Sequence, residues 1–137
     1  MIDSSIAKFI ESHHVMALST VDSEGLPYSS ALFYAFNPEK NILIFASDRD
    51  TAHACHFQKM NQVAFSIYLE TRIVGKVKGL QGRGTVSPAE KDDRMTYLLR
   101  FPYAAMATLT LWKIEPSFLK LTDNKLLGFG KKLIWTI

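Results

Sequence analysis

Cysteine is nearly absent from this chain, and long apolar runs are absent altogether. Cys55 is the single cysteine among 137 residues, so no disulfide can form within one chain. A lone cysteine is typical of proteins from a reducing compartment. No stretch approaches the roughly 20 consecutive apolar residues that a membrane-spanning helix needs, and the polar opening of the chain carries no secretory signal. We therefore expect a soluble, cytoplasmic protein that has no membrane partner.

The chain also lacks a strong charge of either sign. Its net charge is +3 and its pI is about 9.0, which is only mildly basic. The basic pairs Lys76/Lys78 and Lys131/Lys132 are sparser than the Lys/Arg clusters of nucleic-acid-binding surfaces, so we expect no nucleic-acid partner. A chain of this length suits one domain, which buries roughly two-thirds of its unfolded surface. We expect that single domain to cover residues 1–137.

Recognisable catalytic and metal-binding patterns are missing as well. His53 and His56 lie three residues apart on a predicted helix, and Cys55 between them turns to another side. No second cluster supplies the remaining ligands of a four-ligand site, so we expect no metal. The sequence has no Ser-His-Asp pattern and no pair of acids that spacing alone brings together, which leaves the catalytic residues unknown. The segment Gly128–Lys132 lacks the spacing of a phosphate-binding P-loop and predicts a tight turn.

Hydrophobic periodicity predicts a mainly β chain. Apolar residues at i, i+4, i+7 and i+8 from Ile2 predict a first helix, capped by Asp3 or Ser4. The spacing then changes to short β-prone runs separated by turns, and the first three runs predict an antiparallel meander. We expect helices near residues 2–12, 51–59 and 88–100, and strands near residues 15–21, 26–36, 41–46, 61–70, 73–86, 108–114, 118–122 and 132–137. This pattern is typical of an antiparallel β-barrel of about six or seven strands with short helical insertions.

The stretch Asn41–Lys59 is the strongest candidate for a binding site. An apolar strand ends there in a polar loop, and a short helix follows. The first amides of a helix have no partners within it and favour an anion. Ser47 and Thr51 add hydroxyl donors, and Arg49 and His53 add positive charge. The alternative is structural, because Asp50 or Thr51 is a good helix cap and such loops often only connect elements.

A series of segments in the first two-thirds of the chain resembles the FMN-binding split-barrel superfamily, whose best-known members are the pyridoxamine phosphate oxidases. The segments are Met16–Tyr34, with its Thr-Val-Asp and Gly-x-Pro elements, Ile44–Ser47, Asn61–Ile67 and Gly79–Gly84. The C-terminal third is similar to the uncharacterised YhbP-like branch of that superfamily. The segments that carry this second resemblance are Arg100–Pro102, Leu111–Ile114, Leu121–Asn124 and Gly128–Trp135.

The resemblance implies a split barrel that forms a homodimer and binds FMN in grooves between the subunits. The second strand would line the flavin, and the end of the third strand would do so too. The loop and helix start would hold the phosphate, and Gln81, between glycines, would lie near the ring. The residues at these positions are Ser30, Ala31, Leu32, Phe33, Phe45, Ala46, Ser47, Thr51, His53 and Gln81.

The chain departs from the oxidases at two cationic positions. The arginine and lysine that grip the phosphate there correspond to Ser30 and His53 here. Each lost charge-assisted contact weakens binding by roughly 1.5–3 kcal/mol, so FMN is expected to bind weakly unless Arg49 or Arg83 compensates. The resemblance therefore implies a flavin-dependent oxidoreductase of unknown substrate, with pyridoxamine phosphate not expected. The alternatives are a non-catalytic flavin- or ligand-binding dimer, or another cofactor, such as a deazaflavin, in the same groove.

Overall fold

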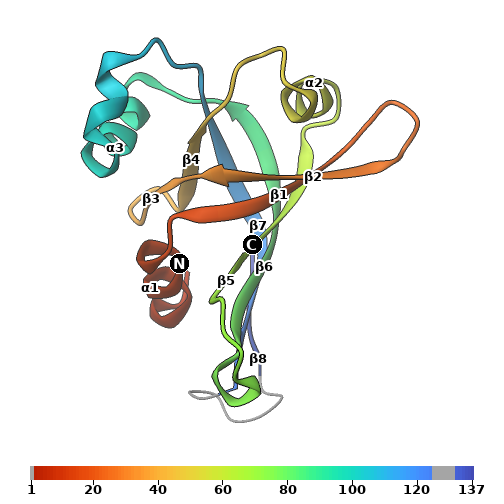
Figure 1. Ribbon diagram of the computed structural model, residues 1–137, viewed down its shortest axis with the longest axis vertical. Coiled ribbons are helices and arrows are strands. Elements are labelled where there is room, and N and C mark those ends of the chain that lie inside the picture. Colours follow the sequence, from red (N-terminus) through yellow and green to blue (C-terminus); the bar gives the residue numbers. More distant parts are fainter. Residues whose placement is uncertain (1, 125–131) are drawn as a thin grey trace.

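The computed structural model describes residues 2–124 and 132–137. Within them the chain forms a curled antiparallel sheet, and its helices lie at separate places around it (Figure 1). The helices are α1 (Ser4–Ser12), α2 (Ala52–Lys59) and α3 (Lys91–Arg100), with short 3-10 turns at Val74–Lys76 and Pro102–Met106. The strands are β1 (Val15–Val21), β2 (Pro27–Phe33), β3 (Ala35–Asn37), β4 (Ile42–Ala46), β5 (Gln62–Tyr68), β6 (Lys78–Pro88), β7 (Leu111–Asp123) and β8 (Lys132–Thr136).

The strand order is β2-β1-β5-β6-β7-β4-β3, and β8 pairs with β7 beside this path. The prediction of a mainly β, antiparallel barrel with short helical insertions is confirmed, and the sheet curls into a half-barrel. The predicted turn at Gly128–Lys132 lies almost wholly outside the described residues. Among the described residues, no helix combines the length and the apolar character needed to cross a membrane.

Helix α1 closes the inner side of the curled sheet. Asp3 is its N-cap, and the carboxylate accepts a hydrogen bond from the amide of Ser5 at 2.8 Å. Ile6, Phe9 and Ile10 point inward and are fully or almost fully buried. These three residues lie on one helical face at the predicted spacing, so burial of that face holds the helix against the sheet.

Strand β4 is buried on both sides, because two apolar clusters meet at it. Leu43 and Phe45 join the main core inside the sheet. Ile42 and Ile44 face a second cluster, which includes Tyr97 of α3. Since side chains alternate along a strand, one short apolar run serves both clusters. The end of β4 is thereby fixed, and this end leads directly into the candidate loop.

The expected antiparallel meander is confirmed in its pairing, since β1 pairs with β2 and β3 pairs with β4, but its middle strand is not continuous. A break at Tyr34 divides the predicted strand 26–36 into β2 and β3, so β2 pairs with β1 while β4 pairs with β3 and β7. The Tyr34 amide donates to the carbonyl of His14 at 2.9 Å, and its buried hydroxyl donates to the carbonyl of Ile10 at 2.6 Å. These two long-range hydrogen bonds turn the chain away from β1, which spacing along the sequence does not reveal.

The two strands expected on either side of Glu115-Pro116 are instead one continuous strand, β7. The register between β6 and β7 shifts between Arg83 and Gly84, and Gly84 pairs with Pro116. Such a bulge accommodates a proline, which has no amide proton for the ladder. A Cβ at Gly84 would lie 2.6 Å from the carbonyl oxygen of Glu115, so only glycine fits opposite this proline.

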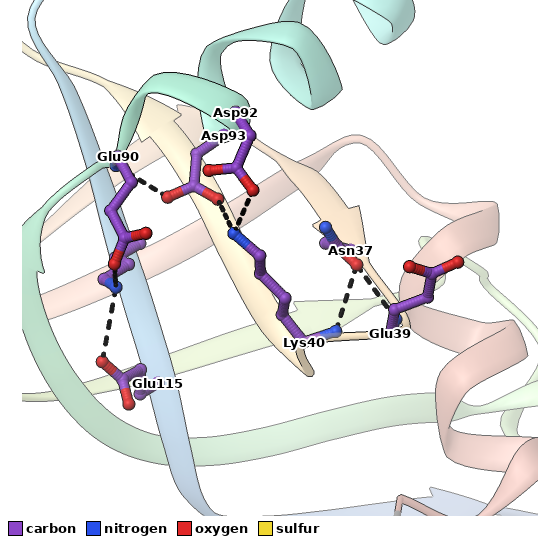
Figure 2. A network of polar contacts seen from close by, with 8 residues as sticks. Asn37, Glu39, Lys40, Glu90, Asp92, Asp93 and Glu115 are labelled. Atoms are coloured by element: carbon purple, nitrogen blue, oxygen red, sulfur yellow. Dashed lines mark hydrogen bonds and ion pairs between the residues drawn. The ribbon is translucent and has the colours of Figure 1, made fainter.

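Helix α3 is anchored by a polar network that Figure 2 shows. The Lys40 ammonium lies 2.6 Å from Asp92 and 3.2 Å from Asp93, whose side chain is fully buried. Asp93 also accepts the amide proton of Glu90 at 2.8 Å. The helix begins at Lys91, three residues after the expected start at residue 88, because Pro88 still pairs with β7 as the last residue of β6.

Candidate functional site

The loop between β4 and α2 is fixed at both of its ends. The Ser47 amide donates to the carbonyl of Thr110 at 3.0 Å, and the Trp112 indole N–H donates to the Ser47 carbonyl at 2.8 Å. At the other end, Thr51 is the N-cap of α2, and its hydroxyl accepts the amide proton of Ala54 at 3.3 Å. Of the two predicted caps, Asp50 and Thr51, the structure uses Thr51.

The side chains of Ser47, Thr51 and His53 meet at this loop, and we call them the Ser47 cluster. Ser47 Oγ lies 3.0 Å from Thr51 Oγ1 and 2.5 Å from His53 Nε2. Thr51 Oγ1 and His53 Nε2 are 3.2 Å apart. The sequence placed these three residues at one anion site, and the fold brings all three together. The cluster lies at the start of α2, where unpaired amides favour negative charge.

Counting protons in the Ser47 cluster assigns the tautomer of His53. Thr51 has one hydroxyl proton, and it donates to the carbonyl of Asp48 at 2.9 Å. The contact between the two hydroxyls therefore takes its proton from Ser47. The short contact between Ser47 Oγ and His53 Nε2 then needs a proton on Nε2. His53 thus presents an N–H toward both oxygens, and an anion that enters can accept this proton and that of Ser47.

His53 is neutral in this arrangement at physiological pH. Burial lowers the pKa of His53, and the neighbouring His56 lowers it further. The imidazole therefore lacks the permanent charge of a lysine. Arg49 is a further cation beside the loop, because its guanidinium carbon lies 5.1 Å from the centre of the Trp112 ring.

The run Ser30–Phe33 divides between the two faces of β2. Ser30 pairs with Leu18 and Leu32 pairs with Met16, both core residues, so these two side chains point inward. Ala31 and Phe33 point to the opposite, outer face of the sheet. The Ser30 hydroxyl is buried and has no hydrogen-bond partner among the described residues.

Helix α2 covers the inner side of β2. The Thr20 hydroxyl lies 2.9 Å from His56 Nδ1, and the Tyr28 ring meets the His56 ring edge-on at 5.3 Å. Tyr28 and Ser30 are two residues apart on β2 and share one face. The buried hydroxyl of Ser30 therefore lies on the side of the strand that α2 covers. An unsatisfied buried hydroxyl is an unfavourable feature that a ligand can correct.

The other predicted site residues lie in two different places. Phe45 is fully buried, and its ring meets that of Phe57 at 5.8 Å, so its side chain belongs to the core. Ala46 follows it as the last residue of β4 and is partly buried. Gln81 is exposed on the outer face, where it pairs with Ser66 and Lys120.

The glycine next to Gln81 serves the core. A Cβ at Gly82 would lie 2.3 Å from the ring of Phe65, so this glycine makes room for a core side chain.

Sequence reasoning missed the contacts that hold the site from a distance. The hydrogen bond from Trp112 to Ser47 joins residues that are 65 positions apart. The contact between Thr20 and His56 spans 36 positions. The only signal in the sequence was the polar residue type of Thr20 within an apolar strand. Within the described part of the chain, no three His, Cys, Asp or Glu side chains gather in a way that could hold a metal.

Comparison with known proteins identifies close relatives of the whole chain. Residues 2–120 match the family model described as pyridoxamine 5'-phosphate oxidase. A UPF0306 protein from Yersinia pseudotuberculosis is 31% identical over 135 residues, which covers 96% of this chain and 90% of that protein. UPF0306 proteins from Yersinia pestis match equally well.

Solved structures share the fold at low sequence identity. A heme binding protein from Mycobacterium smegmatis aligns with a TM-score of 0.77 at 15% identity, covering 99% of this chain and 60% of that one. A FAD-binding protein from Mesorhizobium loti aligns with a TM-score of 0.71 at 12% identity, covering 88% of this chain and 94% of that one. At such identities these alignments demonstrate a common fold and nothing about ligands.

Proposed function

Because the chain belongs to the pyridoxamine 5'-phosphate oxidase family, we propose that it binds FMN and acts as a flavin-dependent oxidoreductase on a small substrate. The single observation that carries this proposal is the Ser47 cluster at the start of α2. Two hydroxyls, a donating imidazole and the free amides of the helix converge there, within 3.2 Å of one another at the side-chain atoms. This set of donors fits a phosphate group.

The buried hydroxyl of Ser30 supports the same site from the other side. It has no partner among the described residues and lies on the face of β2 that α2 covers. A ligand between β2 and α2 would give this hydroxyl a partner. The phosphate is therefore assigned to Ser30, Ser47, Thr51 and His53, and the flavin ring to the inner edge of β2 near Leu32. When bound, the isoalloxazine supplies the redox chemistry, and the protein has to hold and orient it.

A homodimer explains how the remaining residues take part. Ala31, Phe33 and Gln81 lie on the outer face. If a second chain supplies its outer face to the groove, one flavin contacts the inner-face residues of one chain and the outer-face residues of the other. That face exposes Phe33 at 56% and Tyr68 at 65%, and such exposed apolar side chains mark an interaction surface. We propose a two-fold dimer of single-domain chains in the cytoplasm, where the lone Cys55 stays reduced.

The second candidate function is a ligand-binding dimer without turnover. The lowered pKa of His53 favours it, because the neutral imidazole grips a phosphate less strongly than a lysine does. No titratable side chain of the Ser47 cluster other than His53 is available for acid–base work. Haem and FAD are named for proteins of the same fold, so another cofactor in this groove remains the third candidate.

Two measurements separate these candidates. Mass spectrometry of the ligand that purifies with the native protein should find FMN, and titration with FMN should quench flavin fluorescence. Quenching that is absent up to about 100 μM FMN, which corresponds to roughly 5.5 kcal/mol of binding free energy, would remove the flavin proposal. Reduction of bound FMN by NADH or NADPH supports the oxidoreductase. If neither reductant reduces bound FMN, the ligand-binding dimer without turnover is supported.

A further inference from the structure

A second polar hollow lies on the outer face of the sheet, away from the Ser47 cluster. It measures about 370 Å³ and crosses β1, β5, β6 and β7. Its floor is low because small side chains, among them Ser19 and Ser66, occupy the outward positions of β1 and β5. Gln81 and Arg83 of β6 and Lys120 of β7 border it. We call this hollow the outer trough.

Two cationic residues of the outer trough, Arg83 and Lys120, lie close to each other on adjacent strands. Arg83 pairs with Phe118, and the neighbouring pair on the same face is Gln81 with Lys120. Arg83 and Lys120 are therefore diagonal neighbours, whose Cα atoms lie roughly 7–8 Å apart in an antiparallel pair. The Arg83 guanidinium lies over the Phe118 ring, 5.1 Å from its centre. This stacking orients the guanidinium without using its N–H donors.

Arg83 and Lys120 take no part in the ion pairs that the structure describes. Lys40, Lys78 and Lys113 each form an ion pair with a carboxylate. Neither Arg83 nor Lys120 pairs with an acidic side chain among the residues that the structure describes. No Asp or Glu lines the outer trough. Two unpaired cations beside two serine hydroxyls and an amide form a set of donors that lacks negative charge.

We propose that the outer trough is a second anion site, which binds the phosphate or carboxylate group of a small molecule. Arg83 and Lys120 supply the charge, and the Ser19 and Ser66 hydroxyls supply further donors. The site does not depend on the flavin or on the Ser47 cluster. If the proposed dimer forms, Gln81 brings the trough next to the flavin ring. The bound anion would then be the charged group of the substrate or of the electron donor, a consequence that rests on the proposed function.

Isothermal titration of the flavin-free protein with inorganic pyrophosphate, at low ionic strength, tests the outer trough. The double variant Arg83→Gln/Lys120→Gln should bind pyrophosphate at least about tenfold more weakly. The matched control is Lys8→Gln/Lys91→Gln, which removes the same charge from exposed helical positions and should bind as the wild type does. Circular dichroism checks that each variant is folded.

A third variant distinguishes binding at the outer trough from binding at the Ser47 cluster. Ser47→Ala/Thr51→Ala disables the Ser47 cluster and should still bind pyrophosphate at the outer trough. The proposal is overturned if the wild type binds no pyrophosphate, or if the control loses as much affinity as Arg83→Gln/Lys120→Gln does. It is also overturned if all binding disappears in Ser47→Ala/Thr51→Ala. Loss of FMN binding in that last variant concerns the flavin proposal alone.

Discussion

The hydroxyl oxygen of Ser47 and the Nε2 nitrogen of His53 lie 2.5 Å apart, across the loop that joins β4 to α2. Thr51 completes this contact from the N-cap position of α2, and its own proton is used on the carbonyl of Asp48. The cluster is thus satisfied internally. A ligand that enters must replace these internal hydrogen bonds with better ones, and an anion does so by accepting the protons of Ser47 and His53.

Replacing His53 by lysine should tighten FMN binding. The lysine is a permanent cation, whereas burial and the neighbouring His56 lower the pKa of the His53 imidazole. One charge-assisted contact is worth roughly 1.5–3 kcal/mol, so the affinity should rise by at least about tenfold. Fluorescence titration of wild type, His53→Lys and His53→Gln measures this. Equal affinities for Lys and Gln at position 53 would show that the phosphate does not reach this residue.

Binding of FMN should strengthen as the pH falls from 8 to 6. In the free protein the pKa of His53 lies below its usual 6.5, and a bound phosphate raises it, so the complex takes up a proton. Linkage then requires tighter binding at lower pH through the window between the free and the bound pKa. His53→Gln should remove most of this pH dependence, whereas His13→Gln, at the end of α1, should retain it. A pH dependence that persists in His53→Gln would contradict the assignment.

The lowered pKa of His53 should also make the ligand-free protein less stable at low pH, whereas FMN binding strengthens there. His53 binds fewer protons in the folded state than in the unfolded state, so its contribution to stability is complete above pH 6.5. That contribution is lost as the pH falls through the lowered value. Urea unfolding without ligand, between pH 7.5 and 5, should show a smaller loss of stability for His53→Gln than for wild type. An equal loss would mean that burial of His53 does not oppose its protonation.

Trp112 should matter for the loop more than for the core. Phenylalanine at this position keeps an aromatic ring against Phe57, 4.8 Å away in the wild type, but removes the hydrogen bond to the Ser47 carbonyl. We expect Trp112→Phe to lose about 1 kcal/mol of unfolding free energy and to bind FMN more weakly. A variant that loses stability but binds FMN normally would show that the loop is positioned without this bond.

The network around Lys40 should hold α3 against β3 and β4. Lys40→Met leaves the buried carboxylate of Asp93 without its ammonium partner. The melting temperature should fall, and the amides of α3 should exchange hydrogen faster than those of α1. Glu39→Gln, one residue away and outside the ion pair, is the control. Unchanged exchange in α3 would show that packing of Tyr97 and Phe101 holds the helix without the network.

The outer face should form the proposed dimer interface. Phe33→Glu introduces a charge at a residue that is 56% exposed and pairs with the exposed Val15. Light scattering should detect a dimer for wild type and a monomer for this variant. Leu99→Glu, on the exposed side of α3, is the matched control and should remain dimeric. A monomeric wild type at micromolar concentration would contradict the dimer.

The sequence correctly predicted the features that depend on residues close together in the chain. The cap of α1, the cap of α2 and the meeting of Ser47, Thr51 and His53 all depend on residues within one loop or one helical turn. Strand alternation also allows the division of Ser30–Phe33 into two faces to be derived, although the family resemblance assigns the whole run to one ligand. The local half of the candidate site could therefore be read from the sequence.

The features that the sequence did not predict depend on contacts between residues far apart in the chain. The break at Tyr34 depends on hydrogen bonds to Ile10 and His14, and the anchor of α3 depends on Lys40, 53 positions before Asp93. Pro116 suggested a gap between two strands, but the bulge opposite Gly84 allows one strand to continue. No spacing in the sequence encodes these pairings, because each depends on which strands become neighbours.

A comparison of FMN with riboflavin tests the Ser47 cluster most directly, because the two flavins differ only by the phosphate. Titration of wild type and Ser47→Ala/Thr51→Ala with both flavins gives four affinities. We predict that wild type binds FMN at least about tenfold more tightly than riboflavin and that the double variant loses most of this preference. Equal binding of the two flavins by wild type, or an undiminished preference for FMN in the variant, would contradict the account.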